Sequence, residues 1–435
     1  MKRRSPWILA LLVVGWMCPV ALRAQQDAAS FAGFQFNRSL PGARSLAMGG
    51  AFVALADDAT AAYSNPAGLT LLSRREVSLE GRLWNSTNPF TERGRISGTP
   101  SNIGIDTVAG VVRGKNSDHT SSLSFLSYVE TASQRPWAFA LYHHTLVDYS
   151  SQFASQGVFS ADPQVPRFGP YRSRTNFKVL DTGLAYAHQF GQCIQASGCL
   201  RLGAGLAYYD LRLKAVEEIL ADPRDNGPAD FDAPFFTRTS TFADGSAVAG
   251  NLGLIWETTH SWRFAVAYRQ GPDFRIQQNI FGQISSGSFH LPDQFVAGAA
   301  FQPTSALTIS TEFDRVTYSS LLRHNNLQQF GFDLQDGTEA RLGMEYVFFL
   351  GDPIKPTRLA LMAGVWSDPD HRLSFSRPVV VTNDLFRRAY FPTRGGRQDH
   401  ISAGVGANLG SFQVDAGCDR SSDLSTCGLS AVVRF

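Results

Sequence analysis

Segments of about ten residues in which apolar positions alternate with small or polar ones recur along most of the chain. Within 400–409, for example, Ile401, Ala403 and Val405 alternate with Ser402 and Gly404. Strict alternation over this length is typical of a β-strand, because successive side chains of a strand point to opposite faces. We expect fourteen such strands, at 75–84, 119–130, 136–147, 177–190, 200–212, 245–257, 262–270, 292–302, 307–316, 338–348, 357–366, 400–409, 411–418 and 427–435.

The connections between these segments alternate in length. This distinguishes a β-barrel from a β-sandwich, the two all-β architectures whose strands show such alternation. Short connections fall at 131–135, 191–199, 258–261, 303–306, 349–356 and 410, and long ones at 85–118, 148–176, 213–244, 271–291, 317–337 and 367–399, followed by a shorter one at 419–426. Short periplasmic turns, long extracellular loops and an even strand count are typical of a transmembrane antiparallel β-barrel. A β-sandwich has no reason to alternate its loops in this way. Segment 105–113 could form a further strand, but it would break the even count.

The N-terminus carries an export signal. Lys2, Arg3 and Arg4 precede an apolar run over 7–20, and small residues follow up to Ala24. This order is typical of a secretory signal peptide, and the run is short for a membrane-spanning helix, which needs about 20 residues. We therefore expect cleavage after Ala24, so that 1–24 is the signal peptide; an uncleaved anchor is the alternative.

Two features of the strand ends favour a barrel in the bacterial outer membrane. Tryptophans lie at expected strand ends, where an interfacial aromatic girdle would be, at Trp84, Trp137, Trp256, Trp262 and Trp366. The last strand ends on Phe435, which shares a face with Leu429, Ala431 and Val433. This ending resembles the C-terminal signal that the barrel assembly machinery recognises. Outer-membrane lipids and that machinery are therefore expected partners.

The composition agrees with a protein whose outer surface does not face water. Only 17% of the 435 residues are charged, the net charge is +2, and 32 residues are Phe. A nearly neutral chain without basic runs is a poor candidate for binding nucleic acid, whose affinity depends on phosphate neutralisation. The low charge and many aromatic residues also do not fit a disordered chain.

Four cysteines remain after the signal peptide, in two closely spaced pairs, Cys193 with Cys199 and Cys418 with Cys427. In an exported protein such pairs predict local disulfides across turns. Free thiols or a metal site are the alternatives, but no His lies at metal-ligand spacing from either pair.

Catalytic and cofactor-binding motifs are missing from the sequence. There is no G-x-S-x-G, no P-loop, no H-E-x-x-H and no Rossmann glycine fingerprint. His143 and His144 are neighbours on one expected strand, so they point to opposite faces and cannot readily share a metal. We expect a protein that is not an enzyme and that needs no cofactor or metal.

Residues 41–69 read PGARSLAMGGAFVALADDATAAYSNPAGL. This segment resembles the N-terminal region of FadL-type outer-membrane transporters of long-chain fatty acids and other hydrophobic compounds. The resemblance implies a fourteen-stranded barrel over 75–435 whose lumen holds an N-terminal hatch, or plug, formed by 25–74. Asn65, Pro66 and Ala67 match the NPA motif of that hatch. PorV-like barrels of a protein secretion system share the pattern, so a shuttle or scaffold that binds a secretion-system protein is the alternative function.

The residues of this segment suit a plug. Its glycines allow tight turns, and its many alanines fit a crowded lumen. Asp57 and Asp58 could pair with inward-facing arginines, for which the candidates are Arg82, Arg201, Arg263 and Arg341. The alternative is that the NPA motif is only a turn before the first strand.

Two of the long loops are unusually apolar, which marks a binding or packing surface. Loop 213–244 opens with a short helical pattern and carries Phe231, Phe235 and Phe236, and loop 271–291 carries Ile280, Phe281 and Ile284. The family resemblance implies that such loops form an outer groove that captures the ligand; the alternative is that they only cap the barrel. The resemblance also implies a pocket in the lumen, which we expect residues such as Val296, Met362 and Val432 to line. The predicted function is outer-membrane transport of a hydrophobic small molecule, such as a long-chain fatty acid.

Overall fold

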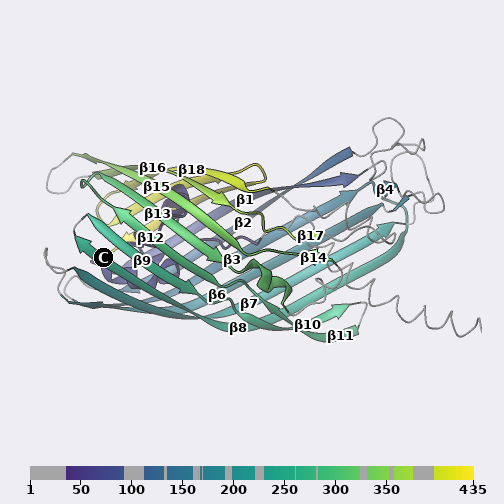
Figure 1. Cartoon of the computed structure of the whole chain (residues 1–435), viewed down its shortest axis with the longest axis horizontal. Helices are drawn as coiled ribbons and strands as arrows, with labels where there is room; N and C mark the ends of the chain where they lie inside the picture. The colour runs from purple at the N-terminus through teal and green to yellow at the C-terminus, as the bar shows by residue number, and fades with distance from the viewer. Residues whose placement is uncertain are drawn as a thin grey trace, which may run out of the picture.

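The computed structural model describes residues 36–92, 112–131, 135–159, 167–168, 170–191, 198–220, 230–259, 261–280, 283–323, 331–351, 357–375 and 396–435. Most of these residues lie in one antiparallel sheet of sixteen strands. Strands β10 and β11 extend that sheet outward from β8, and the other fourteen close into a barrel because β1 pairs with β20 and β8 with β9 (Figure 1). No helix among the described residues is long and apolar enough to cross a membrane.

The fourteen wall strands occur where the alternation predicts them and in the predicted order. They are β1 (Glu76–Glu92), β2 (Val112–Glu130), β3 (Trp137–Ser155), β6 (Tyr171–Phe190), β7 (Cys199–Leu220), β8 (Phe235–Thr259), β9 (Trp262–Arg269), β12 (Gln294–Phe301), β13 (Leu307–Val316), β15 (Gly337–Leu350), β16 (Thr357–Asp368), β18 (Gln398–Asn408), β19 (Phe412–Arg420) and β20 (Leu424–Arg434).

The two faces of the wall differ as the sequence predicts. Along β16, Leu361 and Val365 point outward and are about half exposed, whereas Met362 and Gly364 point inward and are buried. The outward residues form an apolar band that faces lipid. The inward residues are small, polar or charged, and they pack against a segment that fills part of the lumen.

Several strands continue well beyond the apolar band, which corrects the predicted loops. β7 runs on to Leu220, so the helical pattern predicted at the start of loop 213–244 is wrong. The other apolar loop contains the hairpin of β10 (Asp273–Ile280) and β11 (Gln283–His290). Outside the membrane the outward residues become polar, so the apolar alternation ends although backbone pairing continues. Residues 105–111 lie outside the described residues, and 112–113 begin β2.

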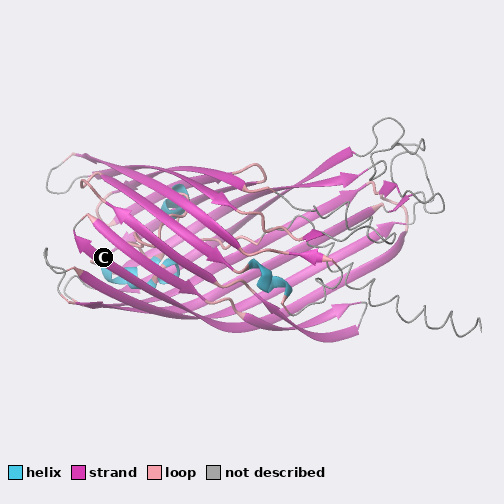
Figure 2. Cartoon of the chain, viewed as in Figure 1, coloured by secondary structure: helices cyan, strands magenta, loops and turns pink. Residues whose placement is uncertain are grey.

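The described N-terminal residues, which we call the luminal segment (36–75), lie inside the barrel near the end where the chain terminates (Figure 2). The luminal segment contains α2 (Ala43–Ala47), α3 (Ala61–Ser64) and the 3-10 helix η1 (Pro66–Leu71). Glycines with positive φ flank α2, with Gly42 before it and Gly49 and Gly50 after it. Only glycine adopts these angles at little cost, so they allow the tight turns into and out of such a short helix.

Small elements near the long-loop end fold over the lumen. They are the 3-10 helix η3 (Tyr318–Leu322) and the two-residue strands β14 (Phe332–Asp333) and β17 (Ser374–Phe375), which pair with each other. Tyr318, Phe332 and Phe375 are buried. We call η3, β14, β17 and residues 369–373, which connect β16 to β17, the roof. A separate short pair, β4 (Val158–Phe159) with β5 (Arg167–Phe168), lies in the connection after β3.

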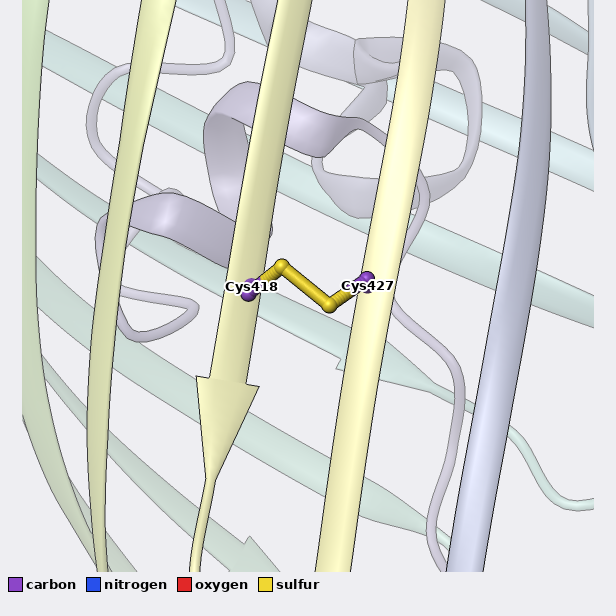
Figure 3. Close-up of a disulfide and its surroundings, with 2 residues drawn as sticks. All are labelled: Cys418 and Cys427. Carbon is purple, nitrogen blue, oxygen red and sulfur yellow. A yellow bond between two sulfur atoms is a disulfide. The ribbon is translucent and has the colours of Figure 1, made fainter.

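One predicted disulfide is confirmed. Cys418 of β19 and Cys427 of β20 are direct cross-strand neighbours and are covalently bonded (Figure 3). Both lie on the outward side of the wall, so the bond joins the last two strands from outside. Cys193 lies outside the described residues, so its pairing with Cys199 stays a prediction.

Candidate functional site

Glutamates of the barrel wall bind the backbone of the luminal segment. The Glu312 carboxylate accepts hydrogen bonds from the backbone N–H groups of Phe52 (2.8 Å) and Val53 (2.6 Å). Glu80 accepts one from the backbone N–H of Gly42 at 2.7 Å. Carboxylate–amide hydrogen bonds are stronger than neutral ones, and they satisfy backbone groups that water does not reach.

Arginines bind the carbonyl groups of the same segment. Arg341 donates to the Gly49 carbonyl at 3.0 Å, and Arg82 donates to that of Leu40 at 2.8 Å. Arg269 donates to the carbonyl of Ser64 and lies over the ring of Tyr63. Charged residues at every second position, on the inward face of the strands, are the sequence signal for these contacts. The pattern does not show which groups of the luminal segment they bind.

The predicted partners of Asp57 and Asp58 are mostly wrong. Asp57 pairs with Arg44 of α2 and lies 4.0 Å from Arg263, which is the one confirmed candidate. Asp58 instead accepts hydrogen bonds from Thr60. The other candidate arginines have carboxylate partners in the wall: Arg82 pairs with Glu80, Arg201 with Glu257, and Arg341 with Asp314 and Glu339. These carboxylates lie on the same strand as the arginine or on a neighbouring wall strand.

The NPA motif holds the second half of the luminal segment. Asn65 is fully buried, its side-chain amide donates to the Val53 carbonyl at 2.9 Å, and its Oδ1 accepts from the Ala67 N–H at 3.2 Å. It thereby caps η1, in which Pro66 takes the first position. Pro at the first helical position loses no hydrogen bond and has the required φ. The motif therefore joins two parts of the luminal segment in addition to forming a turn.

Glycines of the wall let the segment pack backbone against backbone. Inward-facing Gly343, Gly364, Gly404, Gly417 and Gly428 lie on the successive strands β15, β16, β18, β19 and β20. A Cβ added to Gly343, Gly364 or Gly417 would overlap backbone atoms of α2 or of the residues just after it. We call these five residues the glycine seat. Gly203 and Gly253 contact the NPA motif in the same way on the other side of the lumen.

A cavity of about 170 Å³ lies above the luminal segment. The luminal segment contributes Leu40 and Leu46, the roof contributes Tyr318, and the wall contributes Trp84 and Trp366. Trp366 donates from Nε1 to Asp419 at 2.8 Å and stacks on His400. Trp84 and Trp366 therefore face the lumen, which corrects their predicted place in the girdle, whereas Trp256 and Trp262 point outward. The even spacing of Trp366 from inward-facing Met362 and Gly364 is the sequence signal for this face.

The cavity borders an interruption in the wall. The backbone pairing of β2 with β3 covers Phe125–Glu130 with Phe139–His144. Beyond it, β2 pairs with β1 and β3 with β6, and no described backbone pair joins 119–124 to 145–150. We call this stretch the β2–β3 interruption. A bulge at Leu146 accompanies it, and the Leu146 carbonyl accepts from the N–H of Ser39 in the luminal segment.

Side chains from both strands at the interruption line the cavity. Thr120 of β2 and Leu146, Val147 and Tyr149 of β3 are among its lining residues. Farther out, Asp118 of β2 accepts hydrogen bonds from Ser151 and Gln152 of β3, which rejoins the two strands. The cavity therefore lies beside the part of the wall that backbone hydrogen bonds do not close.

A buried histidine–aspartate pair lies at the inner end of the interruption. His144, the last residue of β3 that pairs with β2, points inward and its Nδ1 lies 3.0 Å from Oδ1 of Asp181. The ring of Tyr63 in the luminal segment packs on it with centroids 4.4 Å apart. His143 points outward, so the prediction that the two histidines face opposite sides is confirmed.

The predicted ligand-binding residues do not form one described site. Val296, Met362 and Val432 point inward and are buried as predicted, but none of them lines the cavity. Phe231 precedes β8, Phe235 and Phe236 lie in β8, Ile280 ends β10 and Ile284 lies in β11. Phe281 lies outside the described residues, as do the side chains of Phe235, Phe236, Ile280 and Ile284. The outer groove therefore stays a prediction.

The roof holds a histidine with an altered pKa. His371 is buried and stacks on Tyr318, and its Nδ1 lies 3.1 Å from Oδ1 of Asp368 at the end of β16. Burial lowers the pKa of His371, but the Asp368 carboxylate and the hydrogen bonds to Asp368 and to the Pro369 carbonyl outweigh burial, so the pKa is raised.

Comparisons with known proteins agree with this architecture. The solved structures of a FadL homologue from Pseudomonas aeruginosa (TM-score 0.60, 14% identity, covering 93% of this chain and 100% of that one), the toluene transporter TodX from Pseudomonas putida (0.56, 15%, 92% and 98%) and the toluene transporter TbuX from Ralstonia pickettii (0.52, 15%, 92% and 100%) have similar folds. No curated protein matches the chain.

The family model for outer membrane protein transport proteins (OMPP1/FadL/TodX) matches residues 20–323, well over half of the chain. Members of this family are transport channels and not enzymes, as the missing catalytic motifs predict. The chain therefore belongs to the OMPP1/FadL/TodX family and is an outer-membrane channel for hydrophobic compounds.

Proposed function

We propose that this channel carries compact hydrophobic molecules about as large as one aromatic ring, and that they pass through the cavity and the β2–β3 interruption. The observation that carries this proposal is the cavity beside the unpaired part of the wall. Its volume of about 170 Å³ is comparable to the roughly 150 Å³ apolar protein cavity that binds benzene. Apolar side chains such as Leu46, Val147 and Trp366 supply the contacts that a hydrophobic molecule needs. Charged side chains, among them Arg82 and Arg341, line the rest of the cavity and are paired with carboxylates of the wall.

The contacts of the luminal segment support a sideways route. α2 rests on the glycine seat, and Arg44 of α2 binds Glu345 with two hydrogen bonds, of 2.7 and 2.8 Å. Moving α2 would break these contacts, whereas a molecule in the cavity meets no β2–β3 backbone pair at 119–124. We infer that α2 stays seated while substrate passes, with any rearrangement confined to the cavity side.

Long-chain fatty acids are the second candidate substrate class. The interruption favours them, because an acyl chain longer than the cavity could extend through the wall. Uptake of radiolabelled toluene and oleate, each by cells with and without this protein in the outer membrane, separates the two classes. Uptake of toluene alone supports the ring-sized substrate, uptake of oleate alone contradicts it, and uptake of neither contradicts the transport proposal.

The route is tested by filling the cavity at the interruption. Thr120→Trp places a large side chain in the cavity, whereas Ser121→Trp points outward on the same strand and is the matched control. Because the indole ring would occupy the space in which a ring-sized molecule sits, we expect Thr120→Trp to slow uptake about tenfold or more. Equal uptake by both variants and the parent protein, with heat-resistant folded barrels in each case, would contradict the route.

The outer groove has a separate test. Replacing Phe235 and Phe281 with Ser should weaken capture of a hydrophobic ligand at low concentration, because it removes apolar surface from the predicted groove. Binding of radiolabelled ligand to purified barrels measures it. Unchanged binding with an intact barrel would rule out the groove and leave the cavity proposal standing.

A further inference from the structure

The outward face of β6 and β7 changes character abruptly at the edge of the apolar band. Along β7, Leu206 and Tyr208 point outward and are more than half exposed, and the next outward residues after Asp210 are Arg212 and Lys214. β6 shows the same change, with Leu184 inside the band and Lys178 and Arg174 outside it. Both sets of cations lie on the long-loop side of the band, which the topology makes extracellular.

The strand register places these cations next to one another. Lys178 of β6 lies directly opposite Arg212 of β7, and Lys214 lies opposite Asn176, two residues farther out. Directly opposite side chains of antiparallel strands have Cβ atoms about 4.5–5.5 Å apart, and like charges in this position destabilise the sheet. Each of the inner two cations has a carboxylate neighbour: Asp148 lies 2.8 Å from Lys178, and Asp210 lies 2.7 Å from Arg212.

Arg174 and Lys214 have no such neighbour. Both side chains are exposed, and neither forms an ion pair with any carboxylate of the described residues. The Lys214 ammonium lies 5.7 Å from the ring centroid of Phe242 on β8, at the level where polar and apolar surfaces meet. Two charges on adjacent strands are therefore available to an external anion.

The wider patch also has an excess of positive charge. Glu218 pairs with both Arg172 and Arg238, and Asp244 of β8 lies opposite Arg212. The cations Arg172, Arg174, Lys178, Arg212, Lys214 and Arg238 thus exceed the carboxylates Asp148, Asp210, Glu218 and Asp244, six to four. A chain with a net charge of only +2 carries an equal excess on this one face.

We propose that this face binds phosphate groups of the lipids around the barrel, in the outer leaflet. Charge complementarity identifies the phosphate: guanidinium groups bind phosphate oxygens with two hydrogen bonds, and ammonium groups bind them as point charges. Position identifies the lipid, because the cations lie immediately outside the apolar band, where lipid headgroups meet the barrel, and outside the cavity.

The test compares lipid binding by matched double variants. Arg174→Gln with Lys214→Gln removes the two cations without carboxylate partners, and Arg315→Gln with Arg420→Gln removes two exposed outward arginines on β13 and β19. Native mass spectrometry of each barrel from phosphatidylcholine nanodiscs doped with lipid A measures the bound lipid A. We expect the first variant to bind it about tenfold more weakly than the parent and the control.

Three outcomes would overturn the proposal. They are unchanged lipid A binding in the first variant, an equal loss in the control, and displacement of lipid A by an equal concentration of inorganic phosphate, which would indicate a free-anion site. Resistance of the folded barrel to heat and detergent, measured for both variants, separates a lost site from a lost fold. Uptake of hydrophobic substrate should be unchanged in the first variant, so failure of this proposal and of the transport proposal are distinguishable.

Discussion

The two sides of the lumen hold the luminal segment in opposite ways. On β15–β20 the backbone ladder is continuous, and five glycines let α2 and the residues just after it contact the wall directly. On β2–β3 the ladder stops at Phe125 and His144, a cavity lies beside the gap, and the segment contacts β3 through side chains and single hydrogen bonds such as that from Ser39 to Leu146. The difference suggests a division of labour, in which the glycine seat anchors the segment and the β2–β3 side lets molecules pass.

Adding a side chain at the glycine seat should weaken the anchoring of the luminal segment most. A valine at Gly417 would overlap the Ala43 carbonyl and displace α2. Such overpacking costs about 1–3 kcal/mol, and we expect Gly417→Val to raise the leakage of small solutes in liposome swelling several-fold. Gly81→Val is the control, because a Cβ at Gly81 meets no atom within 4 Å. Equal leakage from the two variants would contradict the anchoring role.

Removing the main ion pair of α2 should have the next largest effect. Arg44 and Glu345 have side chains only 12% and 8% exposed, so Glu345→Ala leaves a nearly buried guanidinium with Asp57 as its nearest partner. Breaking a buried pair costs about 3–5 kcal/mol of stability. Because Arg44 is partly exposed and keeps Asp57 as a partner, we expect a loss of about 2 kcal/mol here. Faster proteolysis within the luminal segment would reveal the loss. Glu130→Ala, at an exposed pair with Arg75, should have almost no effect.

The NPA motif should give a smaller change. Asn65→Ala removes the hydrogen bond to the Val53 carbonyl and the cap of η1. Loss of such a cap costs about 1 kcal/mol, so α2 should stay seated while the second half of the segment becomes easier to cleave. Mapping of the cleavage sites by mass spectrometry distinguishes the halves, and cleavage first at α2 would contradict the division described above.

The smallest effect concerns the roof and depends on pH. The pKa of His371 is higher in the closed roof than in the opened roof, so protonated His371 stabilises the closed roof, and this stabilisation is complete at low pH. It is lost as the pH rises through the raised value. The roof should therefore be more easily cleaved at pH 9 than at pH 6. His371→Gln should remove that pH dependence, and a dependence that persists in this variant would assign it to another group.

The sequence predicts the wall of this protein better than its interior. Every second residue of a wall strand faces lipid and is apolar. Residues such as Leu361 and Val365 therefore identify their strand from the local sequence alone. The strand ends beyond the band have no such signal, so the pattern predicts a helix at the start of loop 213–244, where β7 continues. Asp57 pairs with Arg44, 13 positions away, and Trp366 bonds to Asp419, 53 positions away, and the alternation carries no signal for either partner. Inward glycines such as Gly417 are visible in the sequence, but the helix that rests on them is not.

The most direct test of the central claim is to lock α2 to the glycine seat and measure uptake. A Cβ at Gly428 would lie 3.6 Å from that of Ala43, within the usual range for a disulfide. The double variant Ala43→Cys with Gly428→Cys should form this bond, with the single variants as controls for mispairing with Cys427. We predict that the oxidised double variant takes up toluene at the parent rate. Uptake that is lost on oxidation and restored by a reductant would show that α2 must move, and would contradict the account.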